Sequence, residues 1–269
     1  MHGLGNDFAV FDARKQTLSL NPALSRAISD RRRGIGCDQI VVIADGRDGA
    51  DAVMRIVNAD GGEVETCGNA ARCVAKLLLA ETGKTQLRLL TLGGLLNCFA
   101  AGGGLYGVDM GAAITHWDKI PLSCPADTNR FTLKLKGAAL EAAAVSMGNP
   151  HCVLFVEDAE KADVGVIGPQ IEIHPMFPKR TNVEFVSLRG PDRLRMRVWE
   201  RGTGITQACG SGACAAAFAA HRRGLTSAKV SVELDGGVLG LEIQGGHVLM
   251  TGPASLAYRG QIDLQEFAA

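Results

Sequence analysis

The chain is organised around Ala208-Cys209-Gly210-Ser211-Gly212-Ala213-Cys214-Ala215-Ala216-Ala217, where a cysteine precedes small residues and an alanine-rich run. Alanine has the highest helix propensity, so the run predicts a helix. It ends at His221-Arg222-Arg223 and Gly224, and cations followed by a glycine are favoured at a helix C-terminus. Cys209 therefore lies at the N-terminal end of the predicted helix, where the helix dipole attracts anions and lowers the pKa of a thiol.

A second copy of this pattern lies 142 residues earlier. There Cys67-Gly68-Asn69-Ala70-Ala71-Arg72-Cys73 opens another helix-like run, which Gly83 closes. Further matches recur at an offset of 142 or 143 residues, and they pair Met54-Arg55 with Met196-Arg197, Gly5-Asn6 with Gly148-Asn149, Gln39 with Asn182, and Gly93-Gly94 with Gly236-Gly237. A nearly constant offset indicates an internal duplication, so we expect two similar halves that each place one cysteine at a helix N-terminus.

Each half also carries apolar runs that predict strands. In the first half these runs are residues 8–11, 39–44, 52–58, 87–92, 95–100 and 105–110. In the second half they are residues 131–136, 140–146, 151–156, 183–188, 193–200, 229–234, 239–243 and 248–251. Asn21 followed by Pro22 predicts a further helix, which we expect to continue to about Arg33.

These elements predict a fold of the α/β class, in its α+β form. We expect two pseudo-symmetric lobes, each a curved, mixed and mostly antiparallel sheet wrapped around its central helix, with the active site in the cleft between the lobes. The N-terminal lobe is predicted at residues 1–117 and the C-terminal lobe at 118–269, with the C-terminal tail packing back on the first lobe. The strand at 140–146 has no counterpart ahead of Met1, so the repeat predicts that the first lobe lacks its first strand.

Composition and charge exclude several classes of protein. Basic and acidic residues number 28 each, so the net charge is zero and neither nucleic acid nor an anionic membrane is an expected partner. No signal-peptide core or membrane-length apolar stretch is present, so a cytoplasmic location is expected. The eight cysteines form no C-x-x-C pair, so no zinc ribbon or thioredoxin motif is predicted. Cys37, Cys98, Cys124 and Cys152 are expected to be buried or half-buried packing residues.

Two like thiols in two similar halves suit proton transfer on opposite faces of one atom. Stereoinversion at an amino-acid Cα needs a base that removes the proton from one face and an acid that returns a proton to the other. The backbone N–H groups at each helix start can hold the substrate carboxylate and stabilise the charge that develops. The paired cysteines therefore predict a reaction in which a Cα–H proton is exchanged.

Seven further motifs carry a resemblance to a known family. The motifs that carry it are Met1-His2-Gly3-Leu4-Gly5-Asn6-Asp7-Phe8, Gly36-Cys37-Asp38-Gln39, Asn58-Ala59-Asp60-Gly61, Cys67-Gly68-Asn69-Ala70-Ala71-Arg72, Met147-Gly148-Asn149-Pro150-His151, Thr181-Asn182-Val183-Glu184-Phe185-Val186 and Trp199-Glu200-Arg201-Gly202-Thr203-Gly204. Together with the opening stretch they resemble the diaminopimelate epimerase family, in the same order and over nearly the whole chain. The resemblance implies a two-lobed α/β fold, a homodimer, no pyridoxal phosphate and no metal. It also implies interconversion of LL- and meso-2,6-diaminoheptanedioate, a small amino-acid substrate, in lysine and peptidoglycan precursor biosynthesis.

The same resemblance assigns roles to individual residues. Cys67 is implied as the proton donor and Cys209 as the acceptor in the LL-to-meso direction, and His151 and Glu200 are implied to tune the pKa of the thiols. Phe8 and Asn58 occupy the matching positions of the first half, so these changes are expected to make the two cysteines unequal. The implied substrate-binding residues are Asn6, Gln39, Asn58, Gly68, Asn69, Asn149, Asn182, Glu200, Arg201, Gly210 and Ser211.

Three other functions stay open on the sequence. The nearest is a related cofactor-independent racemase that acts on proline, hydroxyproline or histidine. A second is a thiol redox sensor in which Cys67 and Cys209 form a disulfide, although the lack of a C-x-x-C pair disfavours it. A third is a binding protein without catalysis, which gives no reason for paired cysteines on paired helices.

Overall fold

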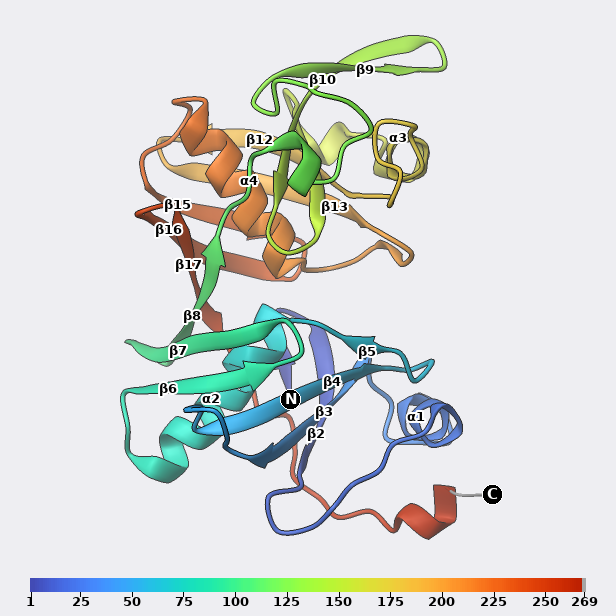
Figure 1. The fold of residues 1–269 in the computed structure, drawn as a ribbon, viewed down its shortest axis with the longest axis vertical. Coiled ribbons are helices and arrows are strands. Elements are labelled where there is room, and N and C mark those ends of the chain that lie inside the picture. Colours follow the sequence, from blue (N-terminus) through green and yellow to red (C-terminus); the bar gives the residue numbers. More distant parts are fainter. Residues whose placement is uncertain (268–269) are drawn as a thin grey trace. The chain divides into compact units, whose positions relative to one another are not determined.

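The computed structural model describes residues 1–267, and residues 268 and 269 of the predicted second lobe lie outside the described residues. The chain forms two compact units (Figure 1). The first contains Met1–Asp109 and the segment from Thr251 onward, and the second is Met110–Met250. The second unit begins ahead of residue 118 because Ala113 and Ile114 already bond to its backbone, at Gly246 and Ser146.

The first unit combines a mixed sheet with two α-helices. Its strands are β1 (His2–Gly3), β2 (Asn6–Asp12), β3 (Gln39–Asp45), β4 (Ala52–Asn58), β5 (Glu63–Val64), β6 (Gln86–Thr91), β7 (Gly94–Gly102) and the first part of β8 (Leu105–Ala112), which continues into the second unit. Its helices are α1 (Pro22–Ser29), α2 (Gly68–Thr82) and the 3-10 helix η3 (Leu264–Phe267). Strand β2 runs parallel to β3 and β4 runs parallel to β6, whereas the other pairs in this unit are antiparallel.

The second unit repeats this arrangement around α4 (Gly210–Arg222). Its strands are β9 (Phe131–Leu135), β10 (Ala138–Ser146), β11 (Pro150–Phe155), β12 (Asn182–Gly190), β13 (Arg193–Glu200), β14 (Gly204–Ile205), β15 (Lys229–Leu234), β16 (Gly237–Gln244) and β17 (His247–Pro253). The remaining helices are η1 (Trp117–Lys119), η2 (Ala159–Lys161) and α3 (Val164–Glu172). Here β11 runs parallel to β12 and β13 runs parallel to β15.

Strand register confirms the duplication residue by residue. Phe8 lies opposite Gln39 in the first unit, and His151 lies opposite Asn182 in the second. These pairs are related by the offset of 143 residues that the sequence shows. The antiparallel pairs Ile40–Val57 and Val183–Trp199 also match, with offsets of 143 residues for the first member and 142 for the second. The predicted fold class, a mixed sheet with one dominant helix in each of two similar halves, is therefore confirmed.

Both dominant helices are buried, because small side chains let the surrounding strands approach closely. Residues Ala213 to Ala217 of α4 have no exposed surface, and α2 is buried from Gly68 to Ala75. Gly83 ends α2 in a left-handed conformation with φ of 69°, which glycine adopts without strain. Each cysteine of the pair is the residue immediately ahead of its helix.

Two expectations about local structure are wrong. Helix α1 begins where predicted, since the Asn21 side chain accepts a hydrogen bond from the Leu24 N–H at 2.8 Å. It ends at Ser29 and does not reach Arg33, because Asp30 is extended and its carboxylate binds the backbone N–H groups of the two residues Arg32 and Arg33. Side-chain to backbone bonds of this kind compete with helix.

On β13, Arg195 is buried because its guanidinium binds Glu160 at 2.6 Å and also Asp235. The other wrong expectation concerns one cysteine. Cys124 is exposed and does not pack in the core, since it lies in a loop beside Met176. Cys37, Cys98 and Cys152 are buried as expected.

Candidate active site

Cys67 occupies the N-cap position of α2, with extended backbone that directs the following N–H groups along the helix axis. The cysteine is half-buried, and Gly68 and Asn69 behind it are buried. Its Sγ lies 3.9 Å from the Asn6 side-chain oxygen, which also accepts a hydrogen bond from Asn69 Nδ2 at 3.2 Å. Four predicted site residues of the first unit are thus brought together at one helix N-terminus.

The Asn6 amide is held on both sides. Its Nδ2 donates to Asp38 Oδ2 at 3.0 Å, and Arg31 binds that same carboxylate and Asp7. This arrangement turns the Asn6 oxygen toward Cys67. Asp38 was not predicted as a site residue, although it belongs to the quoted motif that ends at Gln39. Gln39 in turn donates from Nε2 to Asn58 Oδ1 at 2.9 Å, so these two predicted residues pair with each other.

Cys209 occupies the N-cap of α4 and is buried. Its Sγ accepts a hydrogen bond from the Gly212 N–H at 3.4 Å and lies 3.6 Å from Ser211 Oγ. The thiol also hydrogen-bonds the half-buried Glu200, whose carboxylate accepts from the Thr206 hydroxyl. The second thiol therefore sits among Ser211, Gly212 and a carboxylate, whereas Cys67 faces an amide.

The pKa of Cys209 is raised well above that of an ordinary thiol. Burial is the largest cause, and the negative charges of Glu200 and Glu184 add to it. Hydrogen bonds from Ser211 and the Gly212 N–H act in the opposite direction but are weaker. The expectation that the helix N-terminus brings this thiol toward neutrality is wrong here, because desolvation outweighs the helix dipole. The burial around Glu200 raises the pKa of that carboxyl as well.

His151 lies wholly inside the second unit and binds oxygen atoms at both ring nitrogens. Its Nδ1 is 2.7 Å from Glu184 Oε1, and its Nε2 is 2.9 Å from Asn149 Oδ1. Neither His151 nor Glu184 has exposed surface. The parallel pairing of β11 and β12 creates this contact, since both side chains stand on neighbouring strands. Glu184 is absent from the predicted site, although an acidic residue among the apolar residues of a predicted strand is a visible signal in the sequence.

The remaining predicted residues of the second unit are arranged by the backbone. Asn182 donates from Nδ2 to the Pro150 carbonyl at 3.0 Å and accepts from the Arg201 N–H at 2.9 Å. The Arg201 guanidinium is exposed and donates to the Lys179 carbonyl at 3.2 Å. Gly210 is the first residue of α4 and is buried. The predicted site residues therefore lie either at one of the two helix starts or at or next to a strand end, and the Gln39–Asn58 pair is linked by a hydrogen bond only to itself among the predicted residues.

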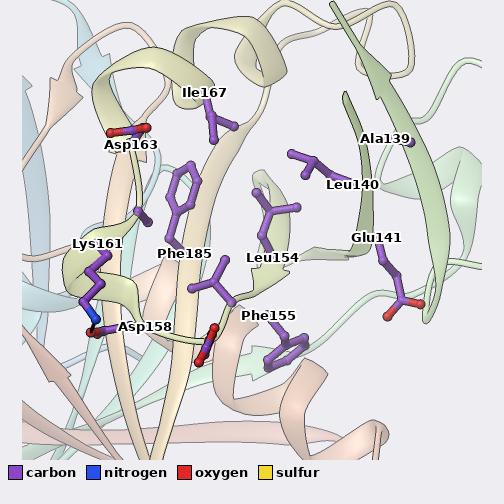
Figure 2. Close-up of a pocket in the computed structure, with 13 residues that line it drawn as sticks. Ala139, Leu140, Glu141, Leu154, Phe155, Asp158, Lys161, Asp163, Ile167 and Phe185 are labelled. Atoms are coloured by element: carbon purple, nitrogen blue, oxygen red, sulfur yellow. Dashed lines mark ion pairs between the residues drawn. The ribbon is translucent and has the colours of Figure 1, made fainter. Parts of the chain in front are cut away.

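A cavity of about 460 Å³ opens elsewhere in the second unit, between β10, β11 and the segment of η2 and α3 (Figure 2). Leu154, Ile167 and Phe185 contribute apolar surface to it, and Asp158 and Lys161 form an ion pair at its edge. No predicted site residue is among the described residues that line it.

Among residues 1–267, no helix is long and apolar enough to cross a membrane.

Replacing Glu200 with glutamine is expected to lower the pKa of Cys209, because it removes a negative charge that raises that pKa. The effect is present only at pH values where Glu200 is ionised. The measurement is the pH dependence of iodoacetamide labelling at Cys209, followed by peptide mass spectrometry. Asp235→Asn is the control, since Asp235 binds Arg195. Superimposable titration curves for wild type and Glu200→Gln would show that the Glu200 charge does not affect the pKa of Cys209.

Several known proteins are similar to this chain over nearly its full length. A protein-family model described as diaminopimelate epimerase matches residues 1–115 and 143–257. The diaminopimelate epimerase of Acidiphilium cryptum is 52% identical over 264 residues, which cover 98% of this chain and 95% of the relative. That of Rhodospirillum centenum is 51% identical over 264 residues and covers 97% and 90% of the two chains.

Solved structures of lower sequence identity share the fold. A hydroxyproline epimerase from Agrobacterium vitis, solved with bound trans-4-hydroxy-L-proline, has a TM-score of 0.66 at 16% identity, covering 94% of this chain and 86% of that one. A predicted epimerase from Pseudomonas aeruginosa has a TM-score of 0.65 at 20% identity, covering 96% and 93%. At these identities the likeness concerns the fold alone.

Proposed function

The chain belongs to the diaminopimelate epimerase family, and we propose on that basis that it interconverts LL- and meso-2,6-diaminoheptanedioate by proton transfer at one Cα. The observation that carries the proposal is the duplicated N-cap cysteine, Cys67 ahead of α2 and Cys209 ahead of α4. A single base would explain one such site. Inversion of a stereocentre explains two, because the proton leaves one face and returns to the other.

In the LL-to-meso direction Cys209 takes the Cα proton and Cys67 delivers one, and the roles exchange in reverse. The raised pKa of Cys209 makes its thiolate a strong base once formed, and burial excludes water that would compete for the proton. The N–H groups of Gly68-Asn69 and Gly210-Ser211 bind the carboxylate next to the reacting carbon. They stabilise negative charge as the C–H bond breaks, which is the electrostatic part of the catalysis.

The far end of the substrate carries an ammonium and a second carboxylate. We assign Arg201 to that carboxylate, since a guanidinium binds a carboxylate through two parallel hydrogen bonds. Its bond to the Lys179 carbonyl must then be exchanged for the substrate. The other polar groups that we assign to substrate binding are Glu200 and the side-chain amides of Asn6, Gln39, Asn58, Asn149 and Asn182.

On the basis of its family we also propose that the protein is a cytoplasmic homodimer. A monomer mass in sedimentation would contradict the dimer.

The test is exchange of the Cα proton for solvent deuterium over a panel of amino acids, under reducing conditions. We expect deuterium in 2,6-diaminoheptanedioate with interconversion of its LL and meso forms. The reduced state matters because a disulfide between the two thiols would block proton transfer. Faster exchange with proline, hydroxyproline or histidine would instead assign the chain to a related racemase. No exchange with any substrate, together with reversible oxidation of Cys67 and Cys209, would favour a redox sensor.

A further inference from the structure

We propose that Glu184 is a positioning residue that keeps His151 doubly protonated, so that the His151 Nε2–H fixes the Asn149 amide with its NH2 group toward the substrate. Two hydrogen bonds carry the proposal, and they link two buried side chains to the half-buried Asn149: Glu184 Oε1 to His151 Nδ1 at 2.7 Å and His151 Nε2 to Asn149 Oδ1 at 2.9 Å. Only its consequence for the substrate rests on the proposed function.

The ring nitrogens of His151 determine how many protons the pair holds. Both face oxygen acceptors, a carboxylate and an amide oxygen, and each such contact requires an N–H donor. The second oxygen of Glu184 is buried and has no hydrogen-bond partner among the described residues, so a proton there would have no acceptor. We therefore place the shared proton on Nδ1, where it points to Glu184 Oε1 at 2.7 Å. This arrangement makes the pair an imidazolium with a carboxylate.

Because the pair is buried, each of its two charges needs the other. A carboxylate without exposed surface needs a partner of opposite charge, because losing its hydration is otherwise very costly. The other titratable groups near the pair are Cys152 on β11, Glu200 on β13 and Cys209 ahead of α4. All three are neutral or negative, so none can replace the imidazolium as the counter-charge of Glu184.

Comparison of the two halves shows that only the second half contains this ion pair. At the offset of 143 residues His151 corresponds to Phe8 and Glu184 to Val41, which are apolar and buried. Asn149 corresponds to Asn6, whose Nδ2 is held by Asp38 and whose oxygen faces Cys67. The two matching asparagines are thus oriented by different partners, a surface carboxylate in one unit and a buried ion pair in the other.

Gly212 lies between this ion pair and Cys209. A Cβ at position 212 would stand 2.8 Å from Glu184 Oε1 and 3.2 Å from Cys209 Sγ. The glycine therefore lets the start of α4 approach the carboxylate, and Glu184 shares its surroundings with the reacting thiol. This closeness explains why Glu184 contributes to the raised pKa of Cys209.

The decisive experiment is nitrogen NMR of the folded enzyme labelled with ¹⁵N-histidine, from pH 6 to pH 9. His151→Gln identifies the signals among the six histidines. We expect both His151 ring nitrogens to carry protons at pH 8 in wild type and only one in Glu184→Gln. Glu172→Gln is the matched control, because Glu172 is also buried but binds Trp199 and Gly202. A bare His151 nitrogen in wild type at pH 8 would overturn the proposal without a mutation.

Activity then tests the positioning role. At pH 8 we expect Glu184→Gln to lower kcat/KM by about 10- to 100-fold, mainly through KM, the size of loss seen when the carboxylate behind a metal-binding histidine is removed. Glu184→Asp keeps the negative charge and should bring KM back toward the wild-type value, with kcat little changed in both variants. Equal losses in kcat and KM that Glu184→Asp does not rescue would show a merely structural role. If wild type epimerised no amino acid, the proposed function would fail while the NMR result stood.

Discussion

Epimerisation by the Cys209→Ser variant is expected to fall by about 10²- to 10⁴-fold, the range that a general acid–base group contributes. A serine hydroxyl fits the same space and can still accept from the Gly212 N–H, which Cys209 Sγ binds at 3.4 Å. It does not ionise near neutral pH, so it cannot take the Cα proton. The measurement is kcat for LL-to-meso conversion, followed by chiral chromatography.

The two cysteine variants should differ in which epimer still exchanges its Cα proton. In Cys209→Ser the remaining thiol, Cys67, can remove and return a proton on one face, so the meso form takes up deuterium without inversion. In Cys67→Ser the same holds for the LL form. Equal loss of exchange with both epimers in both variants would contradict the assignment of one thiol to each face.

Matched controls separate chemistry from packing. Cys73 and Cys214 lie within α2 and α4, are buried, and follow the paired cysteines by six and five residues. Both lie inside their helices and not at a helix N-terminus, and burial raises the pKa of Cys73 to about 12, so we expect neither to exchange a proton with the substrate. Cys73→Ala and Cys214→Ala should keep exchange and inversion together within a few-fold of wild type. If Cys73→Ala or Cys214→Ala lost inversion but kept exchange, disturbed packing of α2 or α4 would be enough to produce that loss. The effects of Cys67→Ser and Cys209→Ser could then not be assigned to their thiols.

Sequence patterns alone predict the repeat and most of the strands of this fold. A constant offset reports which residues occupy matching places, and strands at Ala52–Asn58, Arg193–Glu200 and Lys229–Leu234 agree with their apolar runs residue for residue. Helix α3 was missed because Pro169 and two glycines mask its pattern. The end of α1 was missed because Asp30 offers the backbone another hydrogen-bond partner.

The candidate site shows where sequence reasoning stops. The cysteines and amides are recognised by position, but their ionisation depends on burial, which the sequence does not state. Cys209 illustrates this, since a helix N-terminus and an apolar environment act on its pKa in opposite directions and only packing decides between them. Glu184 was missed for a related reason. Its function depends on a partner 33 residues away on the parallel strand β11.

Phe185→Ala is expected to lower the free energy of unfolding of the second unit by about 3–5 kcal/mol. Phe185 is 1% exposed, and it follows Glu184 on β12 in the cluster that contains Cys152, Leu154 and Val183. Truncation removes most of its apolar surface and enlarges a cavity that already holds about 460 Å³ (Figure 2). The loss of transfer free energy and the cost of the larger cavity act in the same direction.

Urea unfolding followed by tryptophan fluorescence measures this change in the unit concerned. The chain has two tryptophans, Trp117 and Trp199, and both lie in the second unit and pack against the same cluster. Phe155→Ala is the matched control, since Phe155 lines the same cavity but is half-buried, with the Arg223 guanidinium 4.9 Å from its ring centre. We expect its loss to cost about 1–2 kcal/mol, less than a fully buried aromatic. Equal shifts of the midpoint in both variants would show that depth of burial does not govern stability around β12, and that Phe185 has no special part in holding the strand that carries Glu184.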